Sequence, residues 1–325
     1  MAANGDPPVT TRDAMIPCLM TFDVEDWFQV ENLRPLFPPA SWEALPRRVA
    51  GSTRVILSLL AECGIHSTFF ILGWVAEREP ELVREIARAG HEIACHGYSH
   101  VLPMQLTAAQ FKDDVLRARK VLEDVSGQDV IGYRAPSFSL DHERLAILAR
   151  CGFRYDSSHH PVRLHDRYGR LDGLGPPIMP GLYRPDAQMV ELELPVERVG
   201  ILDLPASGGG YFRLFPAALF RTLAAQAIGR RGYYVMYLHS WEFDPAQPRV
   251  RGAGLARAIR HYHNLAGTLP RARRLIAMLK HKGARFVTAR EFIEEALAAH
   301  DGAGEFPSRS GRLEPRLDRL ASIPK

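Results

Sequence analysis

From residue 18 onward, short apolar runs alternate with amphipathic segments, and this alternation restricts the possible folds more than any other feature of the sequence. Parallel strands buried on both faces read as continuous apolar runs, and the helices that connect them read as amphipathic segments. Strands are expected at residues 18–24, 67–72, 91–95, 130–133, 190–194 and 234–238. Helices are expected at residues 53–63, 76–89, 107–125, 140–151, 216–230, 272–282 and 288–299. The pattern predicts an α/β fold, built either as a barrel or as a layered sheet.

The composition is that of a globular protein. Hydrophobic residues make up 46% of the 325 residues and charged residues 24%, which excludes wholesale disorder and fibrous repeats. The formal net charge is +4 and there is no dense basic block, so a nucleic-acid partner has little support. No apolar stretch approaches the roughly 18 residues of a membrane-spanning helix, so no transmembrane segment is expected.

The N-terminus and the cysteines bear on the cellular compartment. Asp6 and two prolines stand where a secretory signal needs an unbroken apolar region, and we therefore expect a cytoplasmic protein. The four cysteines are widely spaced and form no CxxC pair, which predicts reduced thiols and neither a disulfide framework nor a structural zinc cluster.

Two segments depart from the alternation. Residues 157–189 are rich in Pro, Gly, Arg and His and are expected to leave the core as a long excursion. Residues 242–270 are expected to form a second insertion, at the start of a C-terminal extension. The expected organisation is a leader over residues 1–16, one domain over residues 17–298 and a mobile tail over residues 299–325.

A cluster of carboxylates follows the first apolar run. Asp23, Glu25 and Asp26 lie in the stretch TFDVEDWF, at the end of an expected strand, where α/β folds build their sites. Asp23 and Glu25 face the same way if the strand continues, and crowded carboxylates call for a cation or a proton. A solvated acidic loop is the alternative interpretation.

A pair of histidines follows the third apolar run, in HGYSH. His96 and His100 are four residues apart, which on a helix or helical turn puts both imidazoles on one face, in reach of one divalent metal. With 13 histidines in the chain, such a pair can arise by chance and is weak evidence alone. Its position just past an expected strand, at the same end of the sheet as the carboxylates, is what supports a metal site. Two imidazoles and a carboxylate make the open three-ligand site of a hydrolytic metal centre.

Two further polar side chains end apolar runs. Arg134 in GYRAPSF could orient a carboxylate, or it could be a surface arginine before a proline-bounded turn. His239 in YLHSW could be catalytic or structural. Polar groups at the ends of four separate strands together indicate an active site.

In this arrangement the sequence resembles the polysaccharide deacetylases with a NodB homology domain, also called carbohydrate esterase family 4. Five motifs occur in order over roughly residues 18–240: TFDVED, HGYSH, RAPSF, Tyr155-Asp156-Ser157, and LHS at 238–240. The chain is most similar to the branch found in exopolysaccharide gene clusters, whose first motif reads DVED or DVEE. HSWEFDP at 239–245 and SGGGYFRLFP at 207–216 also resemble that branch.

The resemblance implies a fold and a set of roles. The fold would be a distorted (β/α) barrel with about seven strands, and the cofactor a divalent metal, with zinc first and cobalt, nickel or manganese as alternatives. Asp23 would be the general base, Arg134 the residue that orients it, and His239 the general acid. His96 and His100 would be metal ligands.

Two departures from the family pattern leave questions open. Val24 stands where most members have the ligand aspartate, so the third ligand would be Glu25 or Asp26, with Glu25 favoured by members that carry Asp-Val-Asp. No tryptophan follows Asp156 at the usual distance, which leaves one wall of the sugar pocket undefined. Contacts to the sugar are expected from Pro136, Phe138, Asp156 and Trp241.

The predicted function is removal of N-acetyl groups from an N-acetylated sugar or polysaccharide precursor. Hydrolysis of another C–N bond, in a cyclic imide or ureide, is one alternative, and a non-catalytic carbohydrate-binding protein is another. A nucleotide-linked, lipid-linked or short saccharide is the expected substrate.

Arginines and tyrosines in the two irregular segments are expected to rim the pocket and to bind an anionic group of the substrate. They are Arg163, Arg167, Tyr168, Arg170, Tyr183 and Arg184 in the first segment and Arg249, Arg251, Arg257, Arg260 and Tyr262 in the second. Solvated loop charge or an oligomer contact is the alternative interpretation.

Overall fold

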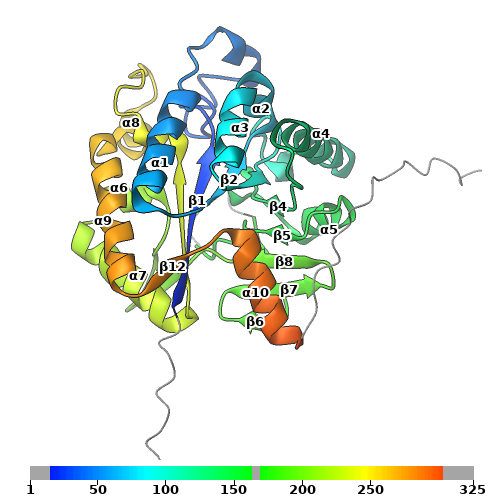
Figure 1. Cartoon of the computed structure of the whole chain (residues 1–325). Helices are drawn as coiled ribbons and strands as arrows, with labels where there is room; N and C mark the ends of the chain where they lie inside the picture. The colour runs from blue at the N-terminus through cyan, green and yellow to red at the C-terminus, as the bar shows by residue number, and fades with distance from the viewer. Residues whose placement is uncertain (1–14, 163–168, 303–325) are drawn as a thin grey trace, which may run out of the picture.

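The computed structural model describes residues 15–162 and 169–302 of the chain (Figure 1). The leader expected over residues 1–16 and the tail expected over 299–325 lie almost entirely outside the described residues. Arg163, Arg167 and Tyr168 also lie outside them.

Seven parallel strands form the centre of the described structure, consistent with the expected distorted (β/α) barrel. In order across the sheet they are β11 (Tyr234–His239), β1 (Ile16–Val24), β2 (Thr68–Ile71), β3 (Glu92–Cys95), β4 (Gly132–Tyr133), β5 (Tyr155–Asp156) and β8 (Met189–Leu192). The antiparallel strands β7 (Leu182–Asp186) and β6 (Pro177–Met179) continue the sheet beyond β8, and β12 (Ala284–Phe286) pairs with the start of β1. A separate hairpin consists of β9 (Val196–Val199) and β10 (Leu202–Pro205).

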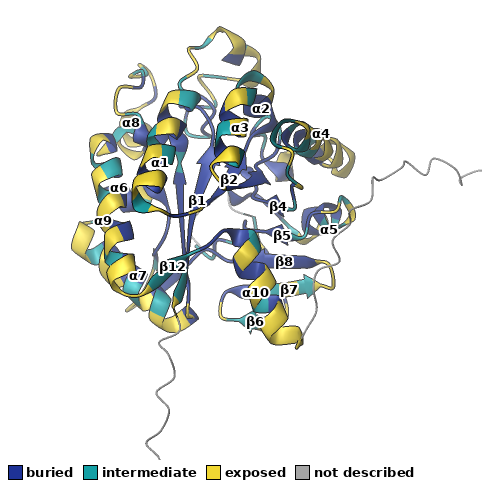
Figure 2. Cartoon of the chain, in the orientation of Figure 1, coloured by how far each residue is buried: buried dark blue, intermediate teal, exposed yellow. Residues whose placement is uncertain are grey.

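Helices cover the outside of the sheet (Figure 1). They are α1 (Val49–Cys63), α2 (Gly73–Arg78), α3 (Pro80–Arg88), α4 (Ala108–Ser126), α5 (His142–Arg150), α6 (Gly209–Leu214), α7 (Ala217–Arg231), α8 (Leu255–Tyr262), α9 (Thr268–His281) and α10 (Ala289–Asp301). Short 3₁₀ turns include η1 (Pro39–Ala44) and η4 (Ser240–Phe243). Figure 2 shows the seven central parallel strands mostly buried, while the covering helices combine buried and exposed residues, as amphipathic sequences require.

Local sequence signals set several element boundaries. The side chain of Thr107 accepts the backbone N–H of Gln110 in the expected capping box, and α4 begins at the next residue. The expected helix over 76–89 is instead two helices, α2 and α3, because Pro80 lacks the N–H of a continuing helix and starts α3. All four cysteines are free, and Cys18 and Cys95 are buried. Among the described helices, none is long and apolar enough to cross a membrane.

The two irregular segments contain more regular structure than the sequence suggested. The described part of residues 157–189 includes β6 and β7, which are bonded into the main sheet, so the expectation of an excursion from the core is wrong there. The antiparallel edge is partly exposed, and its side chains lack the continuous apolar run that marks the parallel strands. Residues 242–270 contain α8.

Two Gly→Ala changes should affect stability in opposite directions. A Cβ on Gly132 of β4 would lie 2.1 Å from the ring of Tyr155, whose hydroxyl donates to Glu92 at 2.8 Å. The ring cannot move freely, and we expect Gly132→Ala to lower the free energy of unfolding by about 1–3 kcal/mol. Gly229 in α7 has open space around its Cβ, and Gly229→Ala should raise the free energy of unfolding by about 0.5–1 kcal/mol.

Urea unfolding followed by circular dichroism checks both values, with Gly229→Ala as the matched control. An unchanged free energy of unfolding in Gly132→Ala would contradict the close approach of β4 to Tyr155.

Candidate active site

The carboxyl ends of the parallel strands bring the expected site residues together. Asp23 of β1 lies directly opposite His239 of β11 in the strand register. His96 follows β3, and Arg134 follows β4 with its backbone N–H bonded to the carbonyl of Cys95. Residues far apart in the sequence therefore meet at one edge of the sheet, as expected for a barrel.

Glu25, His96 and His100 form a buried group whose potential ligand atoms all lie within 4.8 Å of one another. The Nε2 of His100 lies 2.8 Å from a carboxylate oxygen of Glu25. The Nδ1 of His96 lies 2.8 Å from the carbonyl oxygen of Arg134, which leaves Nε2 to face the group. Such an outer contact is typical of a metal-ligating histidine, because it fixes the ring and its tautomer.

The histidines do not lie on a helical turn. Residues 96–100 form a loop in which Gly97 and His100 adopt positive φ angles of 77° and 53°. The loop nevertheless brings the two imidazole centroids to 5.3 Å. The expected spacing is thus achieved by a tight loop and not by helical periodicity.

The charge states of this group suit a divalent cation. Burial raises the pKa of the Glu25 carboxyl, but the interactions with His100, His239 and His96 together bring that pKa down to about 2. Burial is the main cause that lowers the pKa of His96 to about 4. An ionised carboxylate beside a neutral imidazole is the donor set that zinc prefers in catalytic sites, so these residues fit the metal that the sequence suggested.

Asp26 is directed elsewhere. One of its carboxylate oxygens accepts the backbone N–H groups of Arg48 at 2.7 Å and of Val49 at 3.0 Å, at the start of α1. Burial raises the pKa of Asp26 to about 6 in spite of these donors. Of the two carboxylates considered from the sequence, the structure therefore brings Glu25 to the histidines and leaves Asp26 at a helix N-terminus.

Arg134 is fully buried and holds Asp23. Its guanidinium donates to Asp23 at 2.8 Å and to Thr21 at 2.9 Å, and it also bonds to the carbonyl and hydroxyl of Ser157. The second carboxylate oxygen of Asp23 lies 4.0 Å from Nε2 of His96 and 3.8 Å from Nε2 of His239. Arg134 thus fixes one oxygen of Asp23 and leaves the other facing the candidate metal group.

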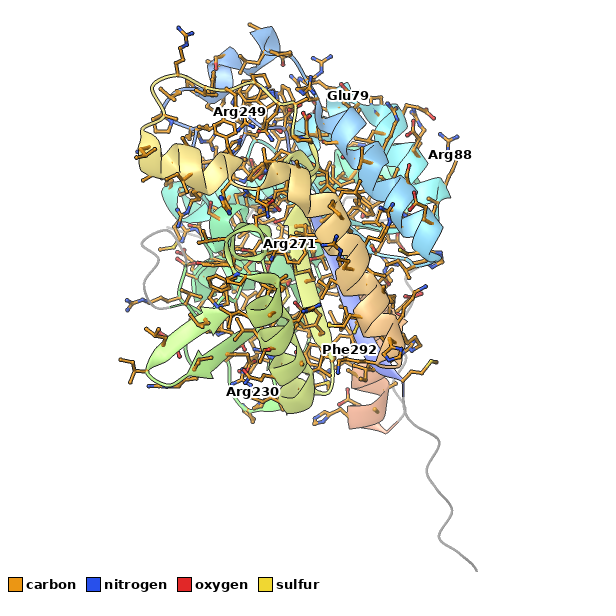
Figure 3. All side chains as sticks on the ribbon, turned by 90° about the vertical axis from the view of Figure 1, so that its left-hand side faces the viewer. Glu79, Arg88, Arg230, Arg249, Arg271 and Phe292 are labelled. Atoms are coloured by element: carbon orange, nitrogen blue, oxygen red, sulfur yellow. The ribbon has the colours of Figure 1, made fainter. Side chains whose placement is uncertain are left out.

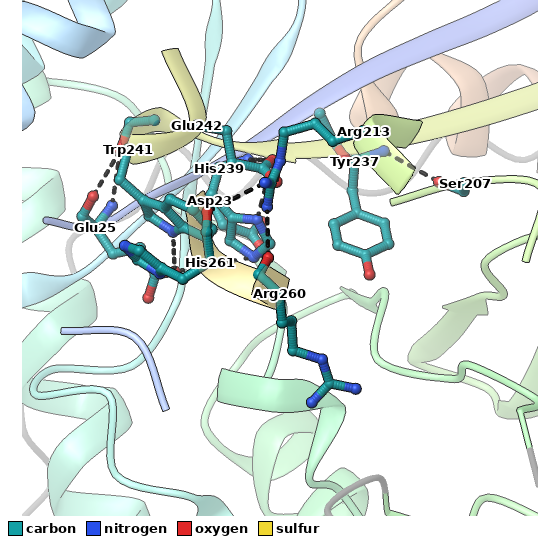
Figure 4. A network of polar contacts seen from close by, with 12 residues as sticks. Asp23, Glu25, Ser207, Arg213, Tyr237, His239, Trp241, Glu242, Arg260 and His261 are labelled. Carbon is teal, nitrogen blue, oxygen red and sulfur yellow. Dashed lines mark hydrogen bonds and ion pairs between the residues drawn. The ribbon is translucent and has the colours of Figure 1, made fainter. Parts of the chain in front are cut away.

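His239 has a buried partner that the sequence analysis did not single out. The Nδ1 of His239 lies 3.3 Å from Glu242, and the Glu242 carboxylate is in turn paired with Arg213 at 3.0 Å (Figure 4). Burial works against charge on His239, but Glu242, together with Glu25 and Asp23, raises the pKa of His239 to about 9. These partners favour the protonated imidazole of His239, the form that a general acid requires.

The motifs HSWEF and SGGGYFR meet at Glu242. A Cβ on Gly209 would lie 1.7 Å from a carboxylate oxygen of Glu242, so the glycine-rich turn leaves space for that side chain. Trp241, its neighbour, donates its indole N–H to Glu25 at 3.0 Å. The sequence offered a signal for these partners. The motifs HSWEF and SGGGYFR contain Glu242, Trp241 and Arg213, and the sequence analysis had given Glu242 and Arg213 no chemical role.

A cavity of about 320 Å³ opens onto the group. It is lined by Asp23, Glu25, Val30, Glu31, Asn32, His96, His100, Ser137, Phe138, Gly210, Tyr211, Arg213, Leu214, Tyr237, His239, Trp241, Glu242, Ala256, Ile259, Arg260 and His263. Of the four expected sugar contacts, Phe138 and Trp241 line this cavity, whereas Pro136 and Asp156 do not. Asp156 is fully buried and accepts the hydroxyl of Ser158 at 2.7 Å.

The expected rim of arginines is only partly present. Among the described arginines of the two irregular segments, Arg260 lines the cavity. Arg184 pairs with Asp301 at 2.7 Å, and Arg249 lies over the ring of Tyr262, 4.5 Å from its centroid. Figure 3 places Arg249 beside α8.

A barrel of parallel strands that brings a buried carboxylate, two histidines and a candidate acid and base to one edge is an arrangement typical of metal-dependent hydrolases. Residues 41–155 match the family model described as polysaccharide deacetylase. Residues 157–294 match a second model, described as a domain of unknown function, DUF3473. The match over residues 41–155 is to the family that the motifs predicted, the polysaccharide deacetylases of the NodB, or carbohydrate esterase family 4, type. The branch suggested by DVED remains a prediction.

Curated relatives match part of the chain. This chain is 32% identical over 124 residues to a peptidoglycan deacetylase of Helicobacter pylori, and the match covers 36% of this chain and 42% of that protein. It is 30% identical over 98 residues to a chitooligosaccharide deacetylase of Bradyrhizobium sp., covering 30% of this chain and 45% of that protein. The matched region spans less than half the length of each relative.

Solved structures share the fold over most of the chain. A structure from Mycobacterium smegmatis assigned as a polysaccharide deacetylase has a TM-score of 0.58 at 24% identity and covers 95% of this chain and 99% of that one. A carbohydrate esterase family 4 pseudoenzyme from Bacillus anthracis has a TM-score of 0.51 at 12% identity and covers 87% of this chain and 67% of that one.

The two neighbouring carboxylates should respond differently to loss of charge. We expect Glu25→Gln to abolish binding of one zinc ion per chain, because it removes the anionic ligand of the buried group. Asp26→Asn should retain the metal but lower the free energy of unfolding by about 1 kcal/mol through the weakened contact to α1.

Zinc binding is measured by metal analysis after dialysis against zinc. The free energy of unfolding is measured by urea unfolding. Stoichiometric zinc in Glu25→Gln, or its loss in a folded Asp26→Asn variant, would contradict this assignment.

Proposed function

We propose that the chain is a metal-dependent hydrolase that removes N-acetyl groups from an N-acetylated saccharide. The observation that carries the proposal is the arrangement around the candidate metal group. Asp23 and His239 both approach this group from neighbouring strands, and each is held by its own buried ion-pair partner. Glu25, His96 and His100 would hold the metal, most suitably zinc.

The candidate metal ligands and the two flanking residues, Asp23 and His239, would have different roles in amide hydrolysis. A divalent ion held by Glu25, His96 and His100 would supply Lewis-acid chemistry, which lowers the pKa of a water and polarises the acetyl carbonyl. Asp23, oriented by Arg134, accepts the proton of the attacking water at its free carboxylate oxygen. His239, kept charged by Glu242, donates a proton to the leaving amine. Phe138 and Trp241 line the cavity where aromatic rings can pack against a sugar face.

The pairing of acid and base favours catalysis over binding alone. A carbohydrate-binding protein needs neither a base fixed by a buried arginine nor a histidine whose pKa is raised to about 9. Acetate release from N-acetylglucosamine oligosaccharides, measured with the zinc-loaded protein, tests the proposal directly. We expect release with zinc and none after chelation. Ring opening of a cyclic imide or ureide without acetate release would replace the proposal.

Loss of the acid or the base should separate chemistry from metal binding. We expect Asp23→Asn and His239→Ala each to lower kcat by about 10²- to 10⁴-fold, the usual contribution of general acid–base catalysis. Metal content should be unchanged. The matched controls are Asp113→Asn and His281→Ala, which change exposed residues on α4 and α9 and should retain full activity. Unchanged turnover in Asp23→Asn or His239→Ala would remove that residue from the mechanism.

Glu242 should set the alkaline limit of activity. His239 must be protonated to act, so the rate is retained below its pKa and lost as pH rises through it. Glu242→Gln removes the negative charge that holds this pKa high, and we expect the alkaline limb of the pH profile of kcat/KM to move to lower pH. The pH profile of kcat/KM is measured for both proteins. Metal analysis and circular dichroism check that the variant binds metal and is folded. An unmoved alkaline limb in a folded, metal-loaded variant would show that Glu242 does not act through His239.

A further inference from the structure

We propose that the saccharide substrate is joined through a phosphate or diphosphate to an aliphatic chain, and that one wall of the cavity binds this carrier end. The inference rests on the proposed function, whose substrate it makes more specific. The wall is formed by α6 and α8 and consists of Tyr211, Leu214, Ala256, Ile259, Arg260 and His263. We call it the α6–α8 wall.

The α6–α8 wall belongs to the same cavity as the candidate metal group. Its residues come from the part of the chain that matches the domain of unknown function. Arg213 anchors it, because its guanidinium donates to the carbonyls of Arg260, His261 and His263 at 3.2, 3.1 and 2.6 Å. The same guanidinium is paired with Glu242, the partner of His239. The end of α8 is therefore fixed relative to the candidate acid.

Large apolar side chains of the wall are exposed to solvent. Leu214 is 56% exposed and Ile259 is 50% exposed, although both line the cavity. Leu255 is 78% exposed and lies one helical turn before Ile259, on the same face of α8. An exposed apolar cluster beside a pocket marks a binding surface for an apolar ligand, because covering it removes this area from water.

A basic side chain lies next to the apolar cluster, because Arg260 follows Ile259 directly. His263, which also lines the cavity, directly follows α8. Figure 4 shows the Arg260 side chain extending away from the network around Glu242 and His239. Arginine suits a phosphate group because its planar guanidinium can donate two parallel hydrogen bonds.

One further acidic residue lines the cavity outside the catalytic set. Glu31 lines the cavity but is paired with Arg34 at 3.6 Å. The α6–α8 wall thus offers positive charge and apolar area side by side. An aliphatic phosphate ester matches both features, whereas a neutral polysaccharide matches only the apolar surface, and this difference favours the ester.

The test compares three substrates that carry the same N-acetylated disaccharide: the free sugar, its 1-diphosphate, and its 1-diphosphate ester with a short prenyl chain. Acetate release from the free sugar tests the proposed function by itself. We expect kcat/KM to rise about tenfold with the diphosphate and about tenfold again with the prenyl chain. Equal kcat/KM for all three substrates would overturn the carrier proposal while leaving deacetylation intact.

Two pairs of variants assign these gains to the wall. Arg260→Gln should remove most of the gain from the diphosphate, and Ile259→Ser most of the gain from the prenyl chain, each judged as a ratio to the free sugar. The matched controls are Arg257→Gln on the same helix and Leu116→Ser on α4, both exposed and outside the cavity lining. Figure 1 shows α4 and α8 on opposite sides of the molecule. Controls that lose the gains equally would show that general charge or hydrophobicity causes them, which would also overturn the proposal.

Discussion

The buried contact between Arg134 and Asp23 is the interaction on which the site depends. The Arg134 guanidinium is fully buried, lies 4.0 Å from the ring centroid of Phe70 and bonds to groups on or after β1 and β5. A buried guanidinium without its carboxylate would be costly by several kcal/mol, so the pair restricts how the strands can be arranged. One electrostatic requirement therefore fixes both the spacing of the strands and the orientation of the candidate base.

The elements predicted well from the sequence are those governed by local rules. Continuous apolar runs identified the parallel strands, and the capping box at Thr107 identified the start of α4. Glu25 was favoured over Asp26 through the resemblance to family members with Asp-Val-Asp. The alternation of side chains along an extended chain agrees with this preference, because it puts Asp23 and Glu25 on one side. The elements missed were short or partly exposed. The hairpin of β9 and β10 follows a proline and pairs only with itself, and α8 is an isolated helix of eight residues between Gly254 and His263.

The partners of the site required the tertiary structure. Arg213 and Glu242 are 29 residues apart and lie on different elements, so no periodicity relates them. Their contact depends on the space that Gly209 leaves beside Glu242, which is a property of packing. Asp156 shows the converse case. Its motif suggested a sugar contact, but its carboxylate is buried against Ser158, and no local pattern distinguishes these two environments.

The two family models meet between residues 155 and 157, but the chemistry crosses that division. Strands β8 and β11 belong to the second matched region, although in the sheet they flank strands β1 to β5 on the two sides. Trp241 and Glu242 also belong to the second region. A fragment that ended near residue 155 would leave β1 and β5 with unpaired backbone groups along their outer edges. Such open edges of apolar strands pair with other chains. The first half would therefore be prone to aggregation when expressed alone, and the two halves must fold as one cooperative unit.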